Sequence, residues 1–166
     1  LGRAEFVYGF MAPRELAQED ARGPMPPIMV TARDGWDVAL RMLPAAVTRL
    51  VTSPAVELSR VTEGLPRSIL HGDAKVANFA ILPDGRVSAF DWAMLCEGCP
   101  TIDIGWYITV SASRLTRSKE DLFATYRSAL QDRLGHTLPD ALWVRMYDAA
   151  LLGGAMVLLW NKALNV

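Results

Sequence analysis

Apolar residues recur at helical spacing through much of the chain before residue 65. A stripe that follows Asp34 predicts a helix that opens there; its members are Trp36, Leu40, Leu43, Val47 and Leu50. Pro44 lies inside this pattern and should kink or divide the helix, because proline lacks a backbone donor. Ser53-Pro54 is typical of a helix start and Gly64 of a helix end, so we expect a further helix between them.

The last third of the chain shows the same periodicity. We expect three helices there, which start near Thr101, Ser118 and Pro139. The last of them includes an apolar stretch of twelve residues, Ala149–Trp160, which is too short to span a bilayer. Gly153-Gly154 would let a neighbour pack closely against this stretch, so we expect a buried helix.

Between these helical regions, residues His71 to Asp91 follow a different pattern. The polar and charged segment 71–78 stands between two apolar runs, and Pro83-Asp84-Gly85 then supplies turn residues. Arg86–Phe90 alternates as a half-buried strand does. We therefore expect a charged loop that leads into a short β-hairpin, whose second strand returns Asp91 towards Asp73 and Asn78.

This arrangement would place two carboxylates, an amide and Lys75 in one small volume. Carboxylates that lie close together and away from water repel each other, and a divalent cation removes that conflict. Mg²⁺ prefers oxygen ligands and is often held by one or two carboxylates together with substrate phosphates. Asn78 and Asp91 are suitable ligands, and Lys75 could neutralise a phosphate. The segment therefore predicts a phosphate-handling site.

The same residues resemble the catalytic core of the aminoglycoside phosphotransferase and choline kinase-like family, which shares the protein-kinase fold. The resemblance is carried by His71-Gly72-Asp73, Lys75, Asn78 and Asp91, at the spacing of the protein-kinase catalytic loop and metal-binding segment. It implies that Asp73 is the catalytic base and that Asn78 and Asp91 hold Mg²⁺. It also implies that Lys75 contacts the transferred phosphoryl group of ATP or GTP.

The resemblance continues to Asp103. Gly98-Cys99-Pro100-Thr101-Ile102-Asp103 is similar to the G-x-P-x-x-D segment of the family, whose aspartate supports the catalytic loop. By itself, an acidic residue in the first turn of a helix is also simply favourable for the helix dipole. For His71 the resemblance implies a packing and hydrogen-bonding role in the loop; its position beside Asp73 would otherwise suggest a general base.

The expected fold class is α+β, mainly α: a protein-kinase-like C-terminal lobe with helices around the catalytic loop 71–78, and with the metal-binding end of the hairpin at Asp91. We expect residues 34–166 to form this lobe and residues 1–33 to form a linker or lobe-connecting segment. The aromatic residues Phe6, Tyr8 and Phe10 alternate, which indicates a strand or an aromatic-lined linker, and Gly23–Pro27 indicates a loop.

A small lobe is not recognisable in the chain. Lys75, Lys119 and Lys162 are its only lysines, so no strand lysine precedes residue 71, and there is no glycine-rich phosphate loop. We therefore expect the 166 residues to be the large lobe alone, inactive when isolated; whether the small lobe lies outside this sequence or is truly absent stays open.

Composition and net charge narrow the range of possible binding partners. The net charge of −1 gives no basic footprint for nucleic acid and no polybasic segment for a membrane. Two cysteines and no signal-peptide pattern favour a cytoplasmic setting. Cys96 and Cys99 form a CxxC, but four zinc ligands would require both histidines of the chain, and no thioredoxin-like pattern surrounds them. We interpret the pair as incidental.

The predicted function is a small-molecule kinase, a phosphotransferase with an alcohol group as acceptor. It would move the γ-phosphoryl group of ATP or GTP to a hydroxyl of an aminoglycoside, an amino alcohol or a sugar, with Mg²⁺ as cofactor. Two alternatives stay open at this stage: a non-catalytic kinase-like module that binds a nucleotide or ligand, and a metal-dependent phosphohydrolase. The sequence indicates neither the acceptor nor the oligomeric state.

Overall fold

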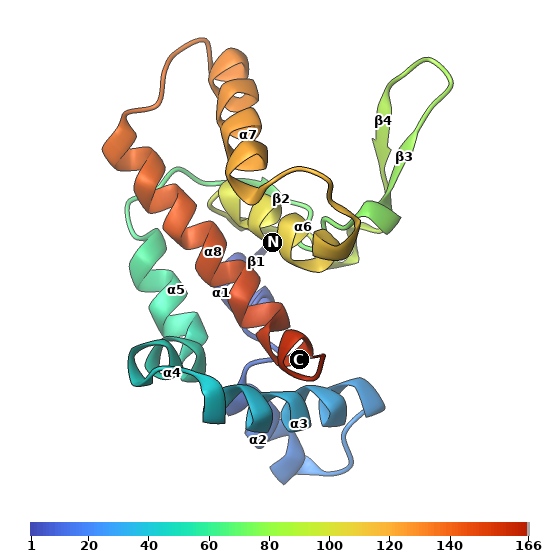
Figure 1. Ribbon diagram of the computed structural model, residues 1–166, viewed down its shortest axis with the longest axis vertical. Helices are drawn as coiled ribbons and strands as arrows, with labels where there is room; N and C mark the ends of the chain where they lie inside the picture. The colour runs from blue at the N-terminus through green and yellow to red at the C-terminus, as the bar shows by residue number, and fades with distance from the viewer. Residues whose placement is uncertain (166) are drawn as a thin grey trace.

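One long helix organises the molecule. The computed structural model describes residues 1–165, which form a mainly helical structure with two small sheets (Figure 1). Helix α8 (Asp140–Ala163) runs through the middle, and α6 (Thr101–Ser111), α5 (Pro54–Thr62) and α3 (Pro27–Met42) pack against it. The mainly α, α+β class expected from the sequence is confirmed.

Glycines set the close approach of α6 and α8. A Cβ at Gly105 would lie 2.2 Å from the carbonyl oxygen of Ala150, and one at Gly154 would lie 2.4 Å from Oγ1 of Thr109. Such contacts are far shorter than a van der Waals contact, so only glycine fits at both positions. The expectation that Gly153-Gly154 serves close packing is confirmed, because Gly153 also faces Ile102.

By length and composition alone, α8 is the one helix within residues 1–165 that could cross a membrane, with a mean hydropathy of 1.4 over its most apolar window. Inside the molecule it behaves as a core helix, since its buried residues face α3, α5 and α6. It has 24 residues and so extends beyond the apolar stretch 149–160 at both ends.

The N-terminal third differs from the expected pattern. Strand β1 (Gly2–Arg3) is only two residues long and is followed by the short helix α1 (Ala4–Val7). The alternation of aromatic residues therefore does not form an extended strand. A helical turn rotates Tyr8 into the core, at 1% exposure, while Phe6 is 66% exposed. The charged segment that follows is also helical, as α2 (Pro13–Arg22), with Leu16 buried.

Helix α3 begins earlier than expected. It starts at Pro27 rather than at Asp34, because proline is well suited to the first helical turn, where a backbone donor has no partner. Asp34 lies inside the helix and pairs with Arg33. The loop expected over Gly23–Pro27 is confined to residues 23–26. Because α3 runs through residue 33, the structure does not mark a boundary there, and the division into linker and lobe stays a prediction.

Pro44 divides the helical pattern as expected. Helix α3 ends at Met42, and α4 (Ala45–Thr52) begins directly after Pro44. Helix α5 then starts at Pro54 and ends at Thr62. Gly64 follows it with a φ of +71°, which suits glycine. Between Pro27 and Thr62 the chain therefore forms three helices, α3, α4 and α5.

Two sheets flank the charged loop. Strand β2 (Ser68–Leu70) pairs antiparallel with β5 (Cys96–Gly98), whose other edge pairs in parallel with β1. The expected hairpin is confirmed as β3 (Phe79–Ile81) and β4 (Val87–Ala89), and it projects away from the helices in Figure 1. Gly85, with a φ of +82°, closes its turn by donating to the carbonyl of Leu82.

Helix α7 (Lys119–Leu134) is bounded as the sequence predicts. The Ser118 hydroxyl accepts a hydrogen bond from the backbone N–H of Asp121, and Gly135 ends the helix in a left-handed conformation. Three short 3₁₀ turns complete the described chain: η1 (Val76–Asn78), η2 (Trp92–Met94) and η3 (Ala112–Arg114).

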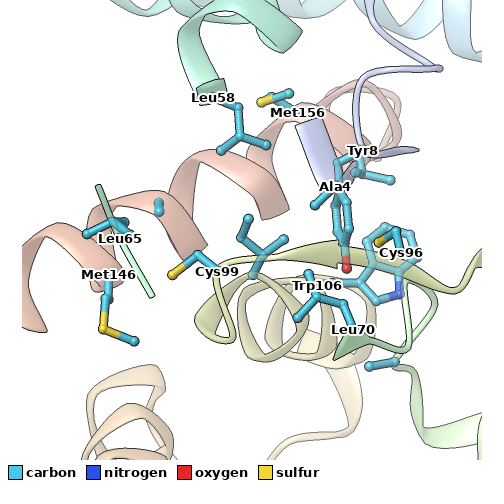
Figure 2. Close-up of a cluster of buried hydrophobic side chains, with 14 residues drawn as sticks. Ala4, Tyr8, Leu58, Leu65, Leu70, Cys96, Cys99, Trp106, Met146 and Met156 are labelled. Carbon is cyan, nitrogen blue, oxygen red and sulfur yellow. The ribbon is translucent and has the colours of Figure 1, made fainter. Parts of the chain in front are cut away.

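The core has two clusters. One gathers side chains from α1, β2, β5, α6 and α8, including Tyr8, Leu70 and Trp106 (Figure 2). The other lies between α2, α3, α4 and the end of α8, around Trp36 and Trp160. The first cluster lies directly beneath the charged loop, so α6 connects the core to the candidate site.

Candidate active site

The charged loop begins with a turn that requires glycine. Strand β2 ends at Leu70, and Gly72 then adopts a φ of +79°. A Cβ at this position would lie 2.0 Å from the carbonyl oxygen of Met94. The loop therefore presses against the segment that follows the hairpin, and this contact brings residues 71–78 and 91–94 together.

Asp103 holds the backbone of the loop. Its Oδ2 accepts a hydrogen bond from the His71 N–H at 2.6 Å, and its Oδ1 accepts one from the Gly72 N–H at 3.1 Å. The Tyr8 hydroxyl also donates to Oδ1, at 2.8 Å. Because α6 carries Asp103 and is packed closely on α8, the loop backbone is tied to the contact between these two core helices.

His71 joins the loop to the end of the hairpin. Its Nδ1 accepts a hydrogen bond from the Asp73 backbone N–H, at 3.3 Å, so the ring proton is on Nε2, which donates to the Phe90 carbonyl at 2.9 Å. The ring also stacks on Trp92, with 4.5 Å between centroids. Both nitrogens are therefore engaged, and neither is available to take a proton from a substrate.

Asp73 lies at the centre of the site with its carboxylate almost fully engaged. The residue is 8% exposed. Its Oδ2 accepts from the Asn78 side-chain amide at 3.0 Å and pairs with Nζ of Lys75 at 2.5 Å. Its Oδ1 accepts from the indole N–H of Trp106 at 3.2 Å. The structure thus brings Asp73, Lys75 and Asn78 into direct contact.

Asp91 follows the hairpin, one residue after Phe90. The Phe90 N–H donates to the Asn78 carbonyl at 3.1 Å, which places the next residue, Asp91, at the edge of the loop. Asp91 has a φ of +63° and is exposed. It makes no hydrogen bond or ion pair with the other described residues, so the structure places it next to the cluster and not inside it.

The oxygen atoms around Asp91 suit a hard cation. Asn78 points its side-chain N–H groups at Asp73, which leaves its side-chain carbonyl oxygen without a donor among residues 1–165. Asn78 is buried, at 4% exposure, but this oxygen is not among the fully buried atoms that lack a partner. No group of three His, Cys, Asp or Glu side chains within the described residues forms a metal site. An amide oxygen and a carboxylate that leave room for phosphate oxygens fit the preference of Mg²⁺.

Sequence reasoning missed Tyr8 and Trp106. Figure 2 shows both side chains beside Cys96, and their rings meet edge to face at 6.3 Å. Burial and the neighbouring Asp103 carboxylate hold the pKa of Tyr8 well above its usual value, so its hydroxyl stays a donor. Tyr8 is 95 residues from Asp103, and no local pattern links them. Trp106 is three positions after Asp103, which puts the two on the same face of α6, and this spacing is the one signal in the sequence that could have pointed to it.

The two cysteines are buried and free. Cys96 faces the first core cluster from β5, and burial together with Asp103 and Glu5 raises the pKa of its thiol to about 11. Cys99 packs in the same cluster, with its sulfur 3.2 Å from the Thr101 hydroxyl. Burial also raises the pKa of Cys99. Both thiols are protonated and buried at neutral pH, which makes them poor nucleophiles and poor metal ligands.

A large open groove lies beside the site. Its volume is about 1070 Å³, and it runs under the hairpin between β2, α6 and α7. Mainly apolar and aromatic side chains line it, among them Ile69, Val76, Phe79 and Tyr107. Asp73, Lys75, Asn78 and Asp91 are not part of its lining. The groove still adjoins the carboxylate cluster, because His71, Ala74 and Asp103 are part of its lining.

The comparison with known proteins agrees with this geometry. Residues 13–147 match the family model of the phosphotransferase enzyme family, APH. No curated protein and no solved structure matches the chain significantly. The matched region includes the loop 71–78, Asp91 and Asp103, and it covers well over half of the 166 residues. The chain therefore belongs to the phosphotransferase enzyme family.

Proposed function

We propose that this protein is the large lobe of a small-molecule kinase that moves the γ-phosphoryl group of ATP or GTP to a hydroxyl of a small acceptor. The observation that supports this most directly is the Asp73 carboxylate, which is held between Asn78, Lys75 and Trp106 on a loop that Asp103 anchors. A carboxylate that is held in place and only slightly exposed is suited to accept a hydroxyl proton.

The neighbouring residues would divide the remaining work. Asn78 and Asp91 would hold Mg²⁺ through their side-chain oxygens, and the bound ion would neutralise charge on the nucleotide phosphates. Lys75 pairs with Asp73 in the structure, and its charged nitrogen would turn to a phosphoryl oxygen when the nucleotide is bound. His71 and Asp103 would hold the loop in shape. Phosphoryl transfer demands this kind of positioning and charge neutralisation more than covalent chemistry.

The acceptor stays within the classes predicted from the sequence: an aminoglycoside, an amino alcohol or a sugar. The test is Mg²⁺-dependent release of ADP or GDP against a panel of these hydroxyl compounds. It uses the longest natural form of the polypeptide, because a nucleotide-covering lobe is not recognisable in these 166 residues. Release that depends on one acceptor class would support the proposal and identify the substrate.

Other outcomes point to the other functions. Phosphate release that depends on metal and needs no acceptor would favour a phosphohydrolase. Binding of Mg²⁺ and nucleotide without turnover on any acceptor would favour a binding module. Either result would contradict the kinase proposal.

A further inference from the structure

A hydrogen bond joins the Trp106 side chain to the Asp73 carboxylate, and the proposed function described above gives this contact no separate role. The indole N–H lies 3.2 Å from Oδ1, in a buried contact between residues 33 positions apart. Trp106 is only 8% exposed, and its ring is held edge to face by Tyr8. An indole N–H can only donate, so Oδ1 is the acceptor in this contact, and the fixed ring gives the carboxylate a defined direction.

The two oxygens of Asp73 differ in how many donors they meet. A carboxylate oxygen accepts about two hydrogen bonds. Oδ2 already meets Asn78 and Lys75, whereas Oδ1 meets only Trp106 among residues 1–165. Oδ1 can therefore accept one more hydrogen bond, and the contact with Trp106 sets the direction of its remaining lone pair.

We propose that Trp106 is a positioning residue that fixes Asp73 so that Oδ1 takes the proton of the acceptor hydroxyl. This rests on the proposed function. In the step, the O–H bond of the acceptor breaks and its proton goes to Oδ1. The acceptor oxygen bonds to the γ-phosphorus while the bond between this phosphorus and the β,γ-bridging oxygen breaks, and the nucleoside diphosphate leaves with that electron pair.

Helix α6 makes this positioning accurate because it carries both supports of the loop. Asp103 holds the loop backbone, and Trp106, less than one turn further along, holds the carboxylate. Gly105 lies between them and lets α6 approach the Ala150 carbonyl closely. One helix thus holds both the loop backbone at His71 and Gly72 and the side chain of Asp73, and such shared support favours preorganised catalysis.

The kinetic test is a double-mutant cycle. Trp106→Phe keeps an aromatic ring and removes the donor, and we expect kcat to fall about tenfold with KM for the nucleotide nearly unchanged. In the Asp73→Ala background the same change should have little further effect, since the group on which Trp106 acts is gone. Trp160→Phe is the matched control, because Trp160 is also buried and its indole donates to the Val157 carbonyl, away from the site.

A second measurement does not depend on catalysis. In ¹H–¹⁵N spectra, Trp106→Phe identifies the Trp106 indole signal by its loss. Asp73→Asn, which removes the charge that this proton faces, should move that signal upfield and leave the Trp160 indole signal in place.

The outcomes separate the two proposals. Equal losses of kcat for Trp106→Phe and Trp160→Phe, an additive cycle, or an unmoved indole signal would overturn the role of Trp106. Absence of phosphotransfer to every acceptor, combined with the expected indole shift, would instead reject the proposed function while the contact itself stands. The positioning role is supported when the cycle is non-additive and the indole signal moves.

Discussion

At the scale of single residues, Asp91 combines an unusual backbone with an exposed carboxylate. It is the one non-glycine residue with a positive φ among those described, at +63°. Aspartate tolerates this left-handed conformation better than most residues, yet glycine adopts it at lower cost. Strain of this kind persists at functional sites because the side chain is needed there. The hairpin end therefore has a feature that stability alone does not explain.

Replacing Asp91 with glycine separates the carboxylate from the backbone. Asp91→Gly removes the proposed Mg²⁺ ligand and keeps the left-handed conformation, so we expect stimulation of turnover by Mg²⁺ to be lost while the unfolding midpoint changes little. The check is a Mg²⁺ titration of activity beside a denaturant titration. Mg²⁺ stimulation equal to that of the wild type would remove Asp91 from the metal site.

A substitution of Asp73 tests its proposed role as the catalytic base. Asp73→Ala should lower kcat by roughly 10²–10⁴-fold, the usual effect of losing a general base, and leave nucleotide binding nearly intact. Single-turnover kinetics and a binding titration measure the two quantities. Unchanged turnover would contradict the assignment. The variant also releases Lys75 and Asn78 from their shared partner, so its fold should be checked by circular dichroism.

At the scale of elements, the pairing of α6 with α8 determines where the site stands. Both helices present glycines at the crossing, and the carbonyl of Ala150 occupies the space that a side chain at Gly105 would need. Helix α6 carries Asp103 and Trp106, so any shift of α6 from α8 is transmitted to the loop. The close crossing thus connects core packing to the candidate site.

Gly105→Ala tests this connection. The added Cβ would lie 2.2 Å from a backbone oxygen, which cannot move aside without shifting a helix. We expect the free energy of unfolding to fall by about 1–3 kcal/mol, the usual cost of overpacking, and activity to fall with it. Gly2→Ala is the control, since its Cβ would make an ordinary contact with Val7 at 3.5 Å. Equal denaturation midpoints for the two variants would show that the crossing tolerates a methyl group.

At the scale of the whole molecule, the N-terminal segment is part of the site's support. Besides Tyr8, α1 contributes Glu5, which is fully buried. One of its carboxylate oxygens accepts from the Thr62 hydroxyl at 3.0 Å and from Arg67 at 3.3 Å, and Arg67 also pairs with Glu97 on β5. Burial raises the pKa of Glu5, but hydrogen bonds from its backbone, Thr62 and Arg67 and the charge of Arg67 outweigh it, so the net pKa is lowered.

This network predicts a specific loss of stability in acid. A carboxyl whose pKa is lower in the folded state stabilises the fold above its unfolded pKa, and this contribution is lost as pH falls through the folded pKa. In Glu5→Gln that contribution is missing. The unfolding free energy should therefore depend less on pH between about pH 6 and pH 3 than in the wild type. Glu63→Gln, at an exposed position, is the control; equal slopes for wild type and Glu5→Gln would contradict the prediction.

Much of the helical pattern and the hairpin could be predicted from the sequence because both depend on neighbouring residues. Pro44, Gly64 and Gly135 mark where helices divide or end, since their backbone chemistry acts locally. Asp34 was misleading as a helix start because the helix already begins at Pro27, where proline suits the first helical turn. The alternation of Phe6, Tyr8 and Phe10 was misleading because only three aromatic residues at every second position are too few to distinguish a strand from a helix.

The sequence by itself determined the family and the types of residue at the site, because Asp73, Lys75, Asn78 and Asp91 lie within one short segment at a fixed spacing. Only the tertiary structure decided how Asp73 is held. Trp106 and Tyr8 reach the site from other elements, and such contacts depend on how α1 and α6 pack in the core. Spacing along the chain specifies local geometry, whereas a hydrogen bond between distant residues exists only once the helices have been placed.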